Sequence, residues 1–544
     1  MNQTPSYASG PSDTALLGEA IGALLTRIAA QYPAREALVV PHQRVRLTFA
    51  QLLADADRVA RGLLAAGVSP GDRVAIWAAN RAEWVLVQYA TARIGAILVN
   101  VNPAYRAHEL VFVLRQSGTS VLICERELRG ADFAAMVDEA RADCPQLRRV
   151  VLLDTPDWPQ LLEAGDEDAA LPAGLDPDDP INIQYTSGTT GFPKGATLTH
   201  HNLVNNGFFV GELCGYTEMD RVCVPVPLYH CFGMVMGVLG AHSHGAAVVL
   251  PAASFDPAGT LAAVSAEHCT SLYGVPTMFI AMLAAPAFPA ADLASLRTGI
   301  MAGSPCPVEV MKRVVAEMHM PEVTICYGMT ETSPVSTQTR ADDDLERRVA
   351  SVGRVHPHVE VKVVDPASGR VVARGLPGEL CTRGYSVMRG YWQEPEKTAE
   401  AIDAAGWMHT GDLAVMAADG YVSIVGRSKD MVIRGGENVY PREVEEFLYA
   451  HPDIEDVQVI GVPDQRYGEE LMAWVRLRPG APELTEDAVR EFCAGRLAHF
   501  KVPRYVHLVE EFPMTVTGKV RKVAMREQAV RLLGIESAGS IPTA

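Results

Sequence analysis

A regular alternation of helix and strand patterns is the feature that most constrains the fold of this chain. Residues 48–124 contain a short apolar strand pattern at Val74–Trp77, a helical pattern at Glu83–Arg93, and further strand patterns at Ala96–Asn100 and Val121–Cys124. Strands that are separated by helices in this way pair in parallel, and the helices cover the sheet. We therefore predict an α/β fold that is built on a mostly parallel sheet.

The first helix of this segment has both a start signal and a stop signal. Thr48 and Gln51 have the spacing of a capping box, and Gly67 stands where a helix would end. Between them the apolar residues recur at helical spacing, which predicts one helix packed on the sheet.

The pattern changes along the 544 residues, a length that suggests three or four structural units. Residues 165–180 are acidic and rich in Pro and Gly, and indicate a connector between two α/β subdomains. Residues 351–424 read as antiparallel strands with Gly turns, which predicts a β-barrel-like third subdomain. A small, mobile α+β domain follows. We place the N-terminal domain at residues 1–428 and the C-terminal domain at residues 429–544.

Composition excludes several classes of protein. The net charge is 47 − 65 = −18, which argues against nucleic acid as the main partner. Ten scattered cysteines without a C-x-x-C argue against a disulfide framework or a structural zinc centre. Residues 1–14 lack a signal-peptide pattern, and the longest apolar stretch, residues 233–250, is interrupted by two histidines. We expect a cytoplasmic protein without a membrane span.

One basic stretch departs from this acidic average. Between Arg496 and Arg526, only Glu510 and Glu511 oppose seven basic residues. These are Arg496, Lys501, Arg504, Lys519, Arg521, Lys522 and Arg526. Two interpretations stay open, a solvated basic surface and a cation cluster that faces a polyanion such as a phosphate chain.

A loop at Tyr185–Gly195 carries the strongest chemical signal. It holds three glycines, four hydroxyl residues and Lys194, all of which suit the binding of an anion by backbone N–H groups and side-chain donors. The loop is not a Walker A sequence, because Pro193 and Gly195 occupy positions that need Gly and Ser or Thr. The predicted phosphate-binding residues are Thr186, Ser187, Gly188, Thr189, Thr190, Gly191 and Lys194.

This loop resembles the signature loop of the adenylate-forming (AMP-binding) superfamily, which includes acyl- and aryl-CoA synthetases, firefly luciferases and peptide-synthetase adenylation domains. Six further motifs are similar to those of the family and follow in the family's order. They are Pro227–Gly233, Ala302–Pro305, Tyr327–Thr332, Thr410–Asp412, Gly426–Tyr440 and Pro513–Lys519. The resemblance spans about residues 15–535, and the flanking sequences look like the medium- to long-chain fatty acyl-CoA branch.

The resemblance implies a binding site for adenosine. Adenine would stack on Tyr327 and lie near Gly303, Ser304 and Gly328, and the ribose would meet Asp412 and Arg427. An aromatic core residue at Tyr327 and a simple turn residue at Asp412 are the ordinary alternatives.

It also implies four catalytic residues. His230 would lie beside the carboxylate of the acid, although a lone histidine in an apolar stretch is often a core residue. Thr330 would donate to the α-phosphate, and Glu331 would bind Mg²⁺. Lys519 would bridge carboxylate and α-phosphate oxygens, where negative charge grows in the transition state.

The expected reaction has two steps that use one site. A carboxylic acid attacks ATP to give acyl-AMP and pyrophosphate, and the thiol of CoA then takes the acyl group. Between the steps the C-terminal domain would rotate about a hinge at Lys429 and bring in Gly435, Gly436 and Glu437 on the CoA side. The paired glycines of that loop also fit an ordinary hairpin turn.

The identity of the acid is the least constrained part of this prediction. Phe232, Met234 and Met236 offer an apolar, adaptable lining, and we favour a medium-chain fatty acid over an aromatic or branched acid. A peptide-synthetase domain would need an acidic residue near the amino-acid ammonium, and residues 230–236 contain none. A luciferase-like oxygenase, a non-catalytic nucleotide-binding protein and assembly as a homodimer stay open.

Overall fold

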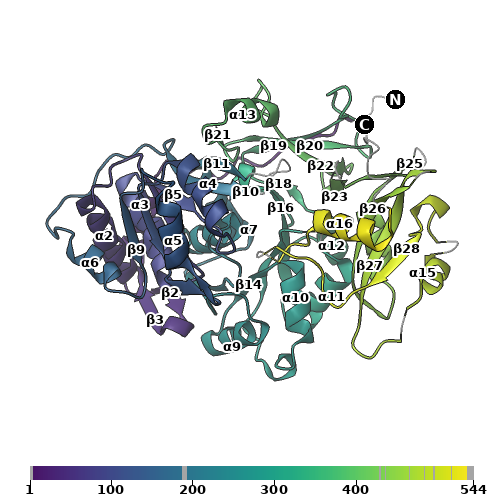
Figure 1. Cartoon of the computed structure of the whole chain (residues 1–544), viewed down its shortest axis with the longest axis horizontal. Coiled ribbons are helices and arrows are strands. Elements are labelled where there is room, and N and C mark those ends of the chain that lie inside the picture. The colour runs from purple at the N-terminus through teal and green to yellow at the C-terminus, as the bar shows by residue number, and fades with distance from the viewer. Residues whose placement is uncertain are drawn as a thin grey trace.

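The computed structural model describes residues 4–186, 193–304, 306–427, 430–434, 437–464, 466–482, 484–493, 496–515 and 518–535. Within these residues the chain forms three large sheets and a separate C-terminal sheet (Figure 1). The predicted fold class is confirmed: two sheets are largely parallel, the third is antiparallel, and the C-terminal part is α+β.

The first sheet contains the strands that alternation predicted. Its order is β21-β11-β10-β5-β4-β6-β9, with parallel pairing from β10 to β9. The strands are β4 (Arg73–Trp77), β5 (Ile97–Asn100), β6 (Val121–Cys124), β9 (Arg149–Leu152), β10 (Pro180–Thr186), β11 (Lys194–Thr199) and β21 (Gly390–Tyr391). The helices of this part are α2 (Phe49–Ala65), α3 (Ala82–Ile94), α4 (Ala107–Ser117), α5 (Phe133–Arg141) and α6 (Asp157–Glu163).

Each face of this sheet is buried by helices. The side chains of α4 and α5 pack with one face of the strands, and those of α2 and α3 belong to the large core on the other face. The capping box at Thr48 and Gln51 is present, and both of its hydrogen bonds form. The sequence therefore predicted these strands correctly. The reason is that strands buried on both faces of a parallel sheet consist of nearly continuous apolar residues.

The second sheet is the central one, with the order β18-β17-β16-β15-β14-β12-β13-β2-β3. Its strands are β2 (Glu36–Val40), β3 (Val45–Thr48), β12 (Arg221–Cys223), β13 (Ala247–Val249), β14 (Ser271–Gly274), β15 (Thr298–Ala302), β16 (Glu322–Gly328), β17 (Val335–Gln338) and β18 (Arg354–Val355). The helices that accompany it are α1 (Ile21–Gln31), α7 (His200–Leu213), α8 (Gly240–His242), α9 (Pro257–Glu267), α10 (Pro276–Ala284), α11 (Val308–Glu317) and α12 (Leu345–Ala350). The hairpin of β2 and β3 comes from far earlier in the chain, and the sequence did not indicate that it joins this sheet.

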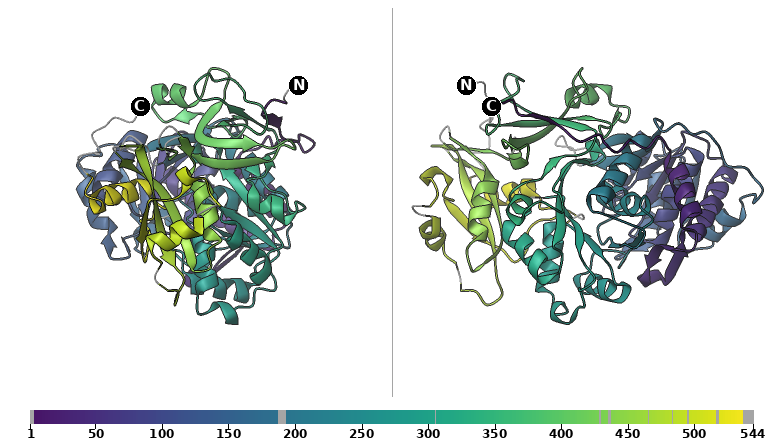
Figure 2. Two further views of the ribbon diagram at one scale, coloured as in Figure 1. Left: turned by 90° about the vertical axis from the view of Figure 1, so that its right-hand side faces the viewer. Right: turned by 180° about the vertical axis from the view of Figure 1, so that it is seen from behind.

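The third sheet is antiparallel, with the order β1-β19-β20-β22-β23. It consists of β1 (Tyr7–Ser9), β19 (Val359–Val364), β20 (Pro377–Gly384), β22 (Met408–Met416) and β23 (Val422–Arg427), and α13 (Pro395–Ala401) lies beside it. The dark purple N-terminal strand runs along this green sheet in the right-hand view of Figure 2. The strand β1, near the start of the chain, therefore belongs to the third, antiparallel subdomain.

The C-terminal sheet has the order β25-β24-β27-β26, with β28 paired to β27. Its elements are β24 (Val432–Arg434), β25 (Glu437–Val439), α14 (Pro441–Tyr449), β26 (Ile454–Asp464), β27 (Gly468–Leu477), α15 (Glu486–Cys493), β28 (Tyr505–Leu508) and α16 (Lys522–Leu532). In Figures 1 and 2 this yellow part lies beside the teal helices α10 and α11. Lys429, the predicted hinge, lies outside the described residues.

Two further expectations concerned the cysteines and the longest apolar stretch. All ten cysteines are buried and free. No helix among the described residues is long and apolar enough to cross a membrane. Residues 233–250, the longest apolar stretch, instead form a buried helical segment, Phe232–Leu239 and α8, before β13.

Candidate active site

Several of the predicted nucleotide residues lie at the carboxyl ends of parallel strands from two sheets. Thr186 ends β10, Gly303 and Ser304 follow β15, and Tyr327 and Gly328 end β16. Thr330 and Glu331 come next, in a single 3-10 turn at Thr330–Thr332. Ligands of open α/β sheets bind at this edge, so the arrangement suits a shared binding site.

The carboxylate of Glu331 is buried and held by two hydroxyl groups. Tyr391 donates to Glu331 Oε1 at 2.9 Å, and the hydroxyl of Thr186 lies 3.4 Å from the same oxygen. The ammonium of Lys194 lies 4.9 Å from the centre of the Tyr391 ring. Burial and the charge of Glu331 raise the pKa of Tyr391, so its hydroxyl stays a donor. Tyr391 thus joins the phosphate-loop lysine to the predicted Mg²⁺ ligand.

His230, Cys231 and Thr330 form a second group beside this carboxylate. The Sγ atom of Cys231 lies 3.8 Å from Thr330 Oγ1 and 3.5 Å from Nδ1 of His230. The backbone N–H of Phe232 donates to the same Nδ1 at 3.2 Å. In the neutral imidazole the proton is therefore on Nε2, which is left as a donor.

His230 is held in its neutral form. Burial, together with the positive charge of Lys519, lowers the pKa of His230 to about 3. The segment before it is fixed by Asn80, whose side chain donates to the carbonyl of Val226 at 2.9 Å and accepts from the N–H of Leu228 at 2.8 Å. His230 is thus a rigidly placed neutral donor rather than a base that titrates near pH 7.

Lys519 reaches this group from the C-terminal domain. The hydroxyl of Thr277, at the start of α10, donates to the carbonyl of Gly518 at 3.0 Å. A Cβ added to Gly303 would lie 3.3 Å from the Lys519 side chain. Gly518 itself has φ +76, and a Cβ there would lie 3.0 Å from Val275. The loop therefore docks through a glycine that permits close approach and directs one lysine toward His230.

The predicted ribose carboxylate stands on a bulge. Cys381 pairs with His409, and Glu379 pairs with Leu413, so residues 410–412 of β22 bulge out between these pairs. Asp412 accepts a hydrogen bond from Tyr327 at 2.7 Å, which joins the ribose and adenine residues. The backbone of Arg427 pairs with that of Asp412 across β23.

Other predicted residues are placed only in part. Ser187, Gly188, Thr189, Thr190, Gly191, Lys429, Gly435 and Gly436 lie outside the described residues. Glu437 is exposed at the start of β25. Phe232, Met234 and Met236 are buried in the large core, and the sulfur of Met234 meets the amide groups of Asn100 and Gln184. Neither amide was identified from sequence.

Three of the seven residues of the basic stretch pair with carboxylates from elsewhere in the C-terminal domain. Lys501 contacts Glu443 at 2.6 Å, Lys522 contacts Glu445 at 2.6 Å, and Arg504 contacts Asp464 at 3.0 Å. For these three residues the pairing favours a neutralised surface over a cluster that faces a polyanion. Lys519 differs from them because it points into the N-terminal domain.

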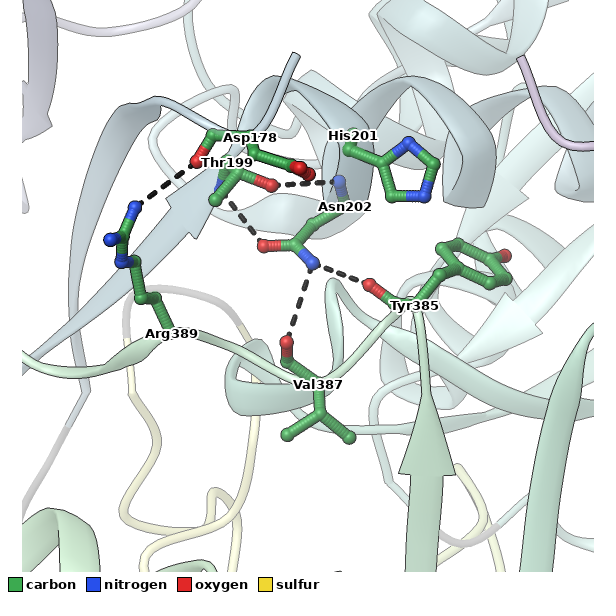
Figure 3. Close-up of a pocket in the computed structure, with 7 residues that line it drawn as sticks. All are labelled: Asp178, Thr199, His201, Asn202, Tyr385, Val387 and Arg389. Atoms are coloured by element: carbon green, nitrogen blue, oxygen red, sulfur yellow. Dashed lines mark hydrogen bonds between the residues drawn. The ribbon is translucent and has the colours of Figure 1, made fainter. Parts of the chain in front are cut away.

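A separate pocket of about 360 Å³ lies where α7 begins (Figure 3). Its lining residues are Asp178, Thr199, His201, Asn202, Tyr385, Val387 and Arg389. Asn202 caps its own helix with Thr199 and donates to the carbonyl of Val387 at 3.3 Å, while Arg389 donates to that of Asp178 at 3.2 Å. These bonds join two subdomains, and none of the predicted site residues lines the pocket.

Comparison with known proteins identifies the family. Residues 25–392 match the model of the AMP-binding enzymes, and residues 443–519 match that of the AMP-binding enzyme C-terminal domain. The protein YngI of Bacillus subtilis is 48% identical, with 96% of this chain and 99% of its own covered. The mitochondrial medium-chain acyl-CoA ligase ACSF2 of Rattus norvegicus is 43% identical over 96% of this chain and 89% of its own.

Solved structures agree with this result. The anthranilate CoA ligase AuaEII in complex with anthranoyl-AMP has a TM-score of 0.88 at 28% identity, with 96% of this chain and 99% of its own covered. ATP-bound MatB from Rhodopseudomonas palustris has a TM-score of 0.84 at 31% identity, with 94% and 99% covered. The chain therefore shares its fold with enzymes that hold ATP and an acyl-adenylate.

The environment of His230 leads to a prediction about its protonation. In an NMR titration of ring-labelled histidine between about pH 8 and pH 5, the signal that is lost in His230→Asn should not shift, since burial and Lys519 keep the ring neutral. In Lys519→Ala its pKa should rise, but stay below the ordinary value because burial is the larger cause. A midpoint near 6.5 in the unmodified protein would show that the ring is solvated instead.

Proposed function

Since this chain belongs to the AMP-binding enzyme family and is an acyl-CoA synthetase, we propose that it activates a medium-chain fatty acid as acyl-AMP and transfers the acyl group to CoA. The observation that carries the proposal is the docked loop, in which Gly518 meets Thr277 and Lys519 is directed toward His230 and Cys231. This is the placement that the first half-reaction requires.

The main difficulty of that half-reaction is electrostatic. A carboxylate has a pKa of about 4, so it is already ionised and needs no general base. It must, however, approach a triphosphate, and the transition state gathers negative charge at the α-phosphorus. Lys519 places a fixed positive charge beside His230, and preorganised charge of this kind is an effective form of catalysis.

The neighbouring residues have complementary tasks. The Nε2–H of neutral His230 is a donor for the carboxylate of the acid, and Thr330 is a donor for the α-phosphate. Lys194 and Thr186 would bind phosphate oxygens of ATP. Glu331 fits Mg²⁺, because it offers a buried carboxylate that Tyr391 and Thr186 orient. When bound there, Mg²⁺ supplies positive charge to the phosphate oxygens.

The adenosine half of ATP is held by a separate set of residues. Tyr327 offers a flat ring for adenine, with Gly303, Ser304 and Gly328 close to its edge. Asp412 would accept from the ribose hydroxyls, and its hydrogen bond to Tyr327 keeps the two subsites in register. Arg427, whose backbone pairs with Asp412, would reach the same sugar.

The second half-reaction requires a different placement of the C-terminal domain. We propose that residues 429–544 rotate as a domain about Lys429, which withdraws Lys519 and brings Gly435, Gly436 and Glu437 toward the CoA thiol. Such a rotation would break the hydrogen bond from Thr277 to Gly518 and separate the loop from Val275.

The nature of the acid is proposed from the relatives and from the core around His230. The ACSF2 relatives are named medium-chain acyl-CoA ligases, and Phe232, Met234 and Met236 are apolar and adaptable. An aromatic or branched acid is the second candidate, since AuaEII is named an anthranilate CoA ligase. A cytoplasmic location and a homodimer stay predictions, and the ACSF2 relatives are named mitochondrial.

Substitution of Lys519 tests the two-step mechanism. Lys519→Ala should slow acyl-AMP formation by at least about 100-fold, the size expected when a preorganised charge is removed. The reaction of supplied acyl-AMP with CoA should be retained, because Lys519 has left the site in that step. Lys501→Ala is the matched control: Lys501 pairs with Glu443 on the surface, and its loss should change neither rate. Equal loss of both half-reactions in Lys519→Ala would contradict the mechanism.

A panel of acids tests the proposed substrate. Pyrophosphate release with ATP and Mg²⁺ should depend on added acid and be fastest, by kcat/KM, with unbranched fatty acids of medium length. Each methylene that the core accommodates should contribute about 0.8 kcal/mol, or roughly fourfold, up to the length that fits. Faster reaction with anthranilate or a branched acid would favour the second candidate, and release without any acid would contradict synthetase activity.

A further inference from the structure

Three side chains with metal-binding atoms meet at the base of the bulge that carries Asp412. Their ligand atoms all lie within 4.8 Å of one another. Glu379 Oε2 lies 2.9 Å from His409 Nδ1, and Cys381 Sγ lies 3.5 Å from the same nitrogen. We propose that Glu379, Cys381 and His409 form a binding site for a divalent transition-metal ion of the zinc type, distinct from the Mg²⁺ used with ATP.

Strand pairing brings the three residues together. Glu379 and Cys381 are two positions apart on β20, and His409 on β22 is the direct partner of Cys381. The register shift at this point brings the Glu379 carboxylate to the same nitrogen. The donors are thus set by two paired strands rather than by a loop, which gives the precision that a metal site needs.

The chemistry of the donor set selects a class of ion. A thiolate, an imidazole and a carboxylate are ligands of Zn²⁺ and Co²⁺, whereas Mg²⁺ prefers oxygen ligands alone. Cys381 and Glu379 would together supply two negative charges, which balance a divalent cation. Three protein ligands leave a fourth position for water, so this would be an open site, unlike the closed structural zinc centre that the cysteine pattern argued against.

The surroundings also suit a metal ligand. Asp403 Oδ2 lies 3.9 Å from Nε2 of His409, on the side away from the cluster, where a carboxylate can orient the ring. The side chains of His409 and Glu379 are 34% and 17% exposed, so an ion can enter from solvent, while Cys381 is buried. Lys362 carries a positive charge near Cys381 that would oppose the binding of a cation. Its ammonium lies 4.4 Å from the centre of the Trp407 ring.

Binding would release the proton of Cys381 to solvent. The ion must displace this proton in order to bind the thiolate, so its affinity should rise with pH. The hydrogen bond between His409 Nδ1 and Glu379 Oε2 would give way to bonds from both atoms to the ion, with the imidazole proton on Nε2, toward Asp403. The other oxygen of Glu379 can keep the N–H of Gly411, from which it accepts at 3.1 Å. The ion would therefore sit behind the loop that presents Asp412 without occupying the ATP site.

Cobalt binding to the full chain tests the proposal. One equivalent of Co²⁺ should give a thiolate-to-cobalt absorption band and the intense visible bands of a tetrahedral site, and Zn²⁺ should remove both. An excess of Mg²⁺ should leave them unchanged. The affinity for Co²⁺ should be higher at pH 8 than at pH 6.

Matched variants locate the site. Cys381→Ser should abolish the thiolate band and weaken Co²⁺ binding by about tenfold or more, and His409→Gln should weaken it likewise. Cys144→Ser, which changes a buried free cysteine in another subdomain, should leave the spectrum unchanged. Retained acyl-CoA formation by Cys381→Ser would show that this variant is folded. The absence of the band in the unmodified chain, or an equal band in both Cys381→Ser and His409→Gln, would overturn the proposal.

Discussion

One hydrogen bond, from the hydroxyl of Thr277 to the carbonyl of Gly518, joins the catalytic loop to the N-terminal domain. The electrostatics of the proposed first half-reaction depend on it, because this contact places the positive charge of Lys519 near His230. Gly518 and Gly303 allow the approach, since a side chain at either position would press on Val275 or on Lys519 itself. A chain with a net charge of −18 thereby gains one cation at the point where anions must meet.

The two halves of the candidate site, one on the N-terminal domain and one on the C-terminal domain, are held in different ways. The residues that we propose for adenosine and Mg²⁺ lie on β16, β22 and the adjoining turn. Hydrogen bonds such as those from Tyr327 to Asp412 and from Tyr391 to Glu331 join them. Lys519 instead belongs to the C-terminal domain, and among the described residues its loop meets the N-terminal domain at Thr277 and Val275. A fixed half suits nucleotide binding, and a detachable half suits an enzyme that performs two reactions in one place.

Much of the fold could be predicted because its signals are local. The capping box at Thr48 and the apolar strands at residues 74–124 carry their structure within a few positions. The placement of β1 and of the β2–β3 hairpin could not be predicted, because each pairs with strands more than a hundred residues away. Short strands carry no signal that names such a distant partner.

For the candidate site too, the sequence indicated only the part whose signals are local. Motif residues such as Glu331 and Asp412 were identified from sequence, whereas the residues that orient them were not. Tyr391 lies 60 residues from Glu331, and Thr277 lies 241 residues from Gly518, so only the folded chain brings each pair together. The basic stretch was ambiguous for the same reason, since the carboxylates that pair with Lys501 and Lys522 lie in other elements.

A double-mutant cycle on the rate of acyl-AMP formation tests the role of the docked loop most directly. Thr277→Val removes the donor and keeps the size, and it should slow this rate by about two- to tenfold, the worth of one hydrogen bond. In a Lys519→Ala background the same change should have no further effect, because the bond acts only by placing Lys519. An equal slowing in both backgrounds would show that Thr277 acts on the site independently of Lys519 and would contradict the account.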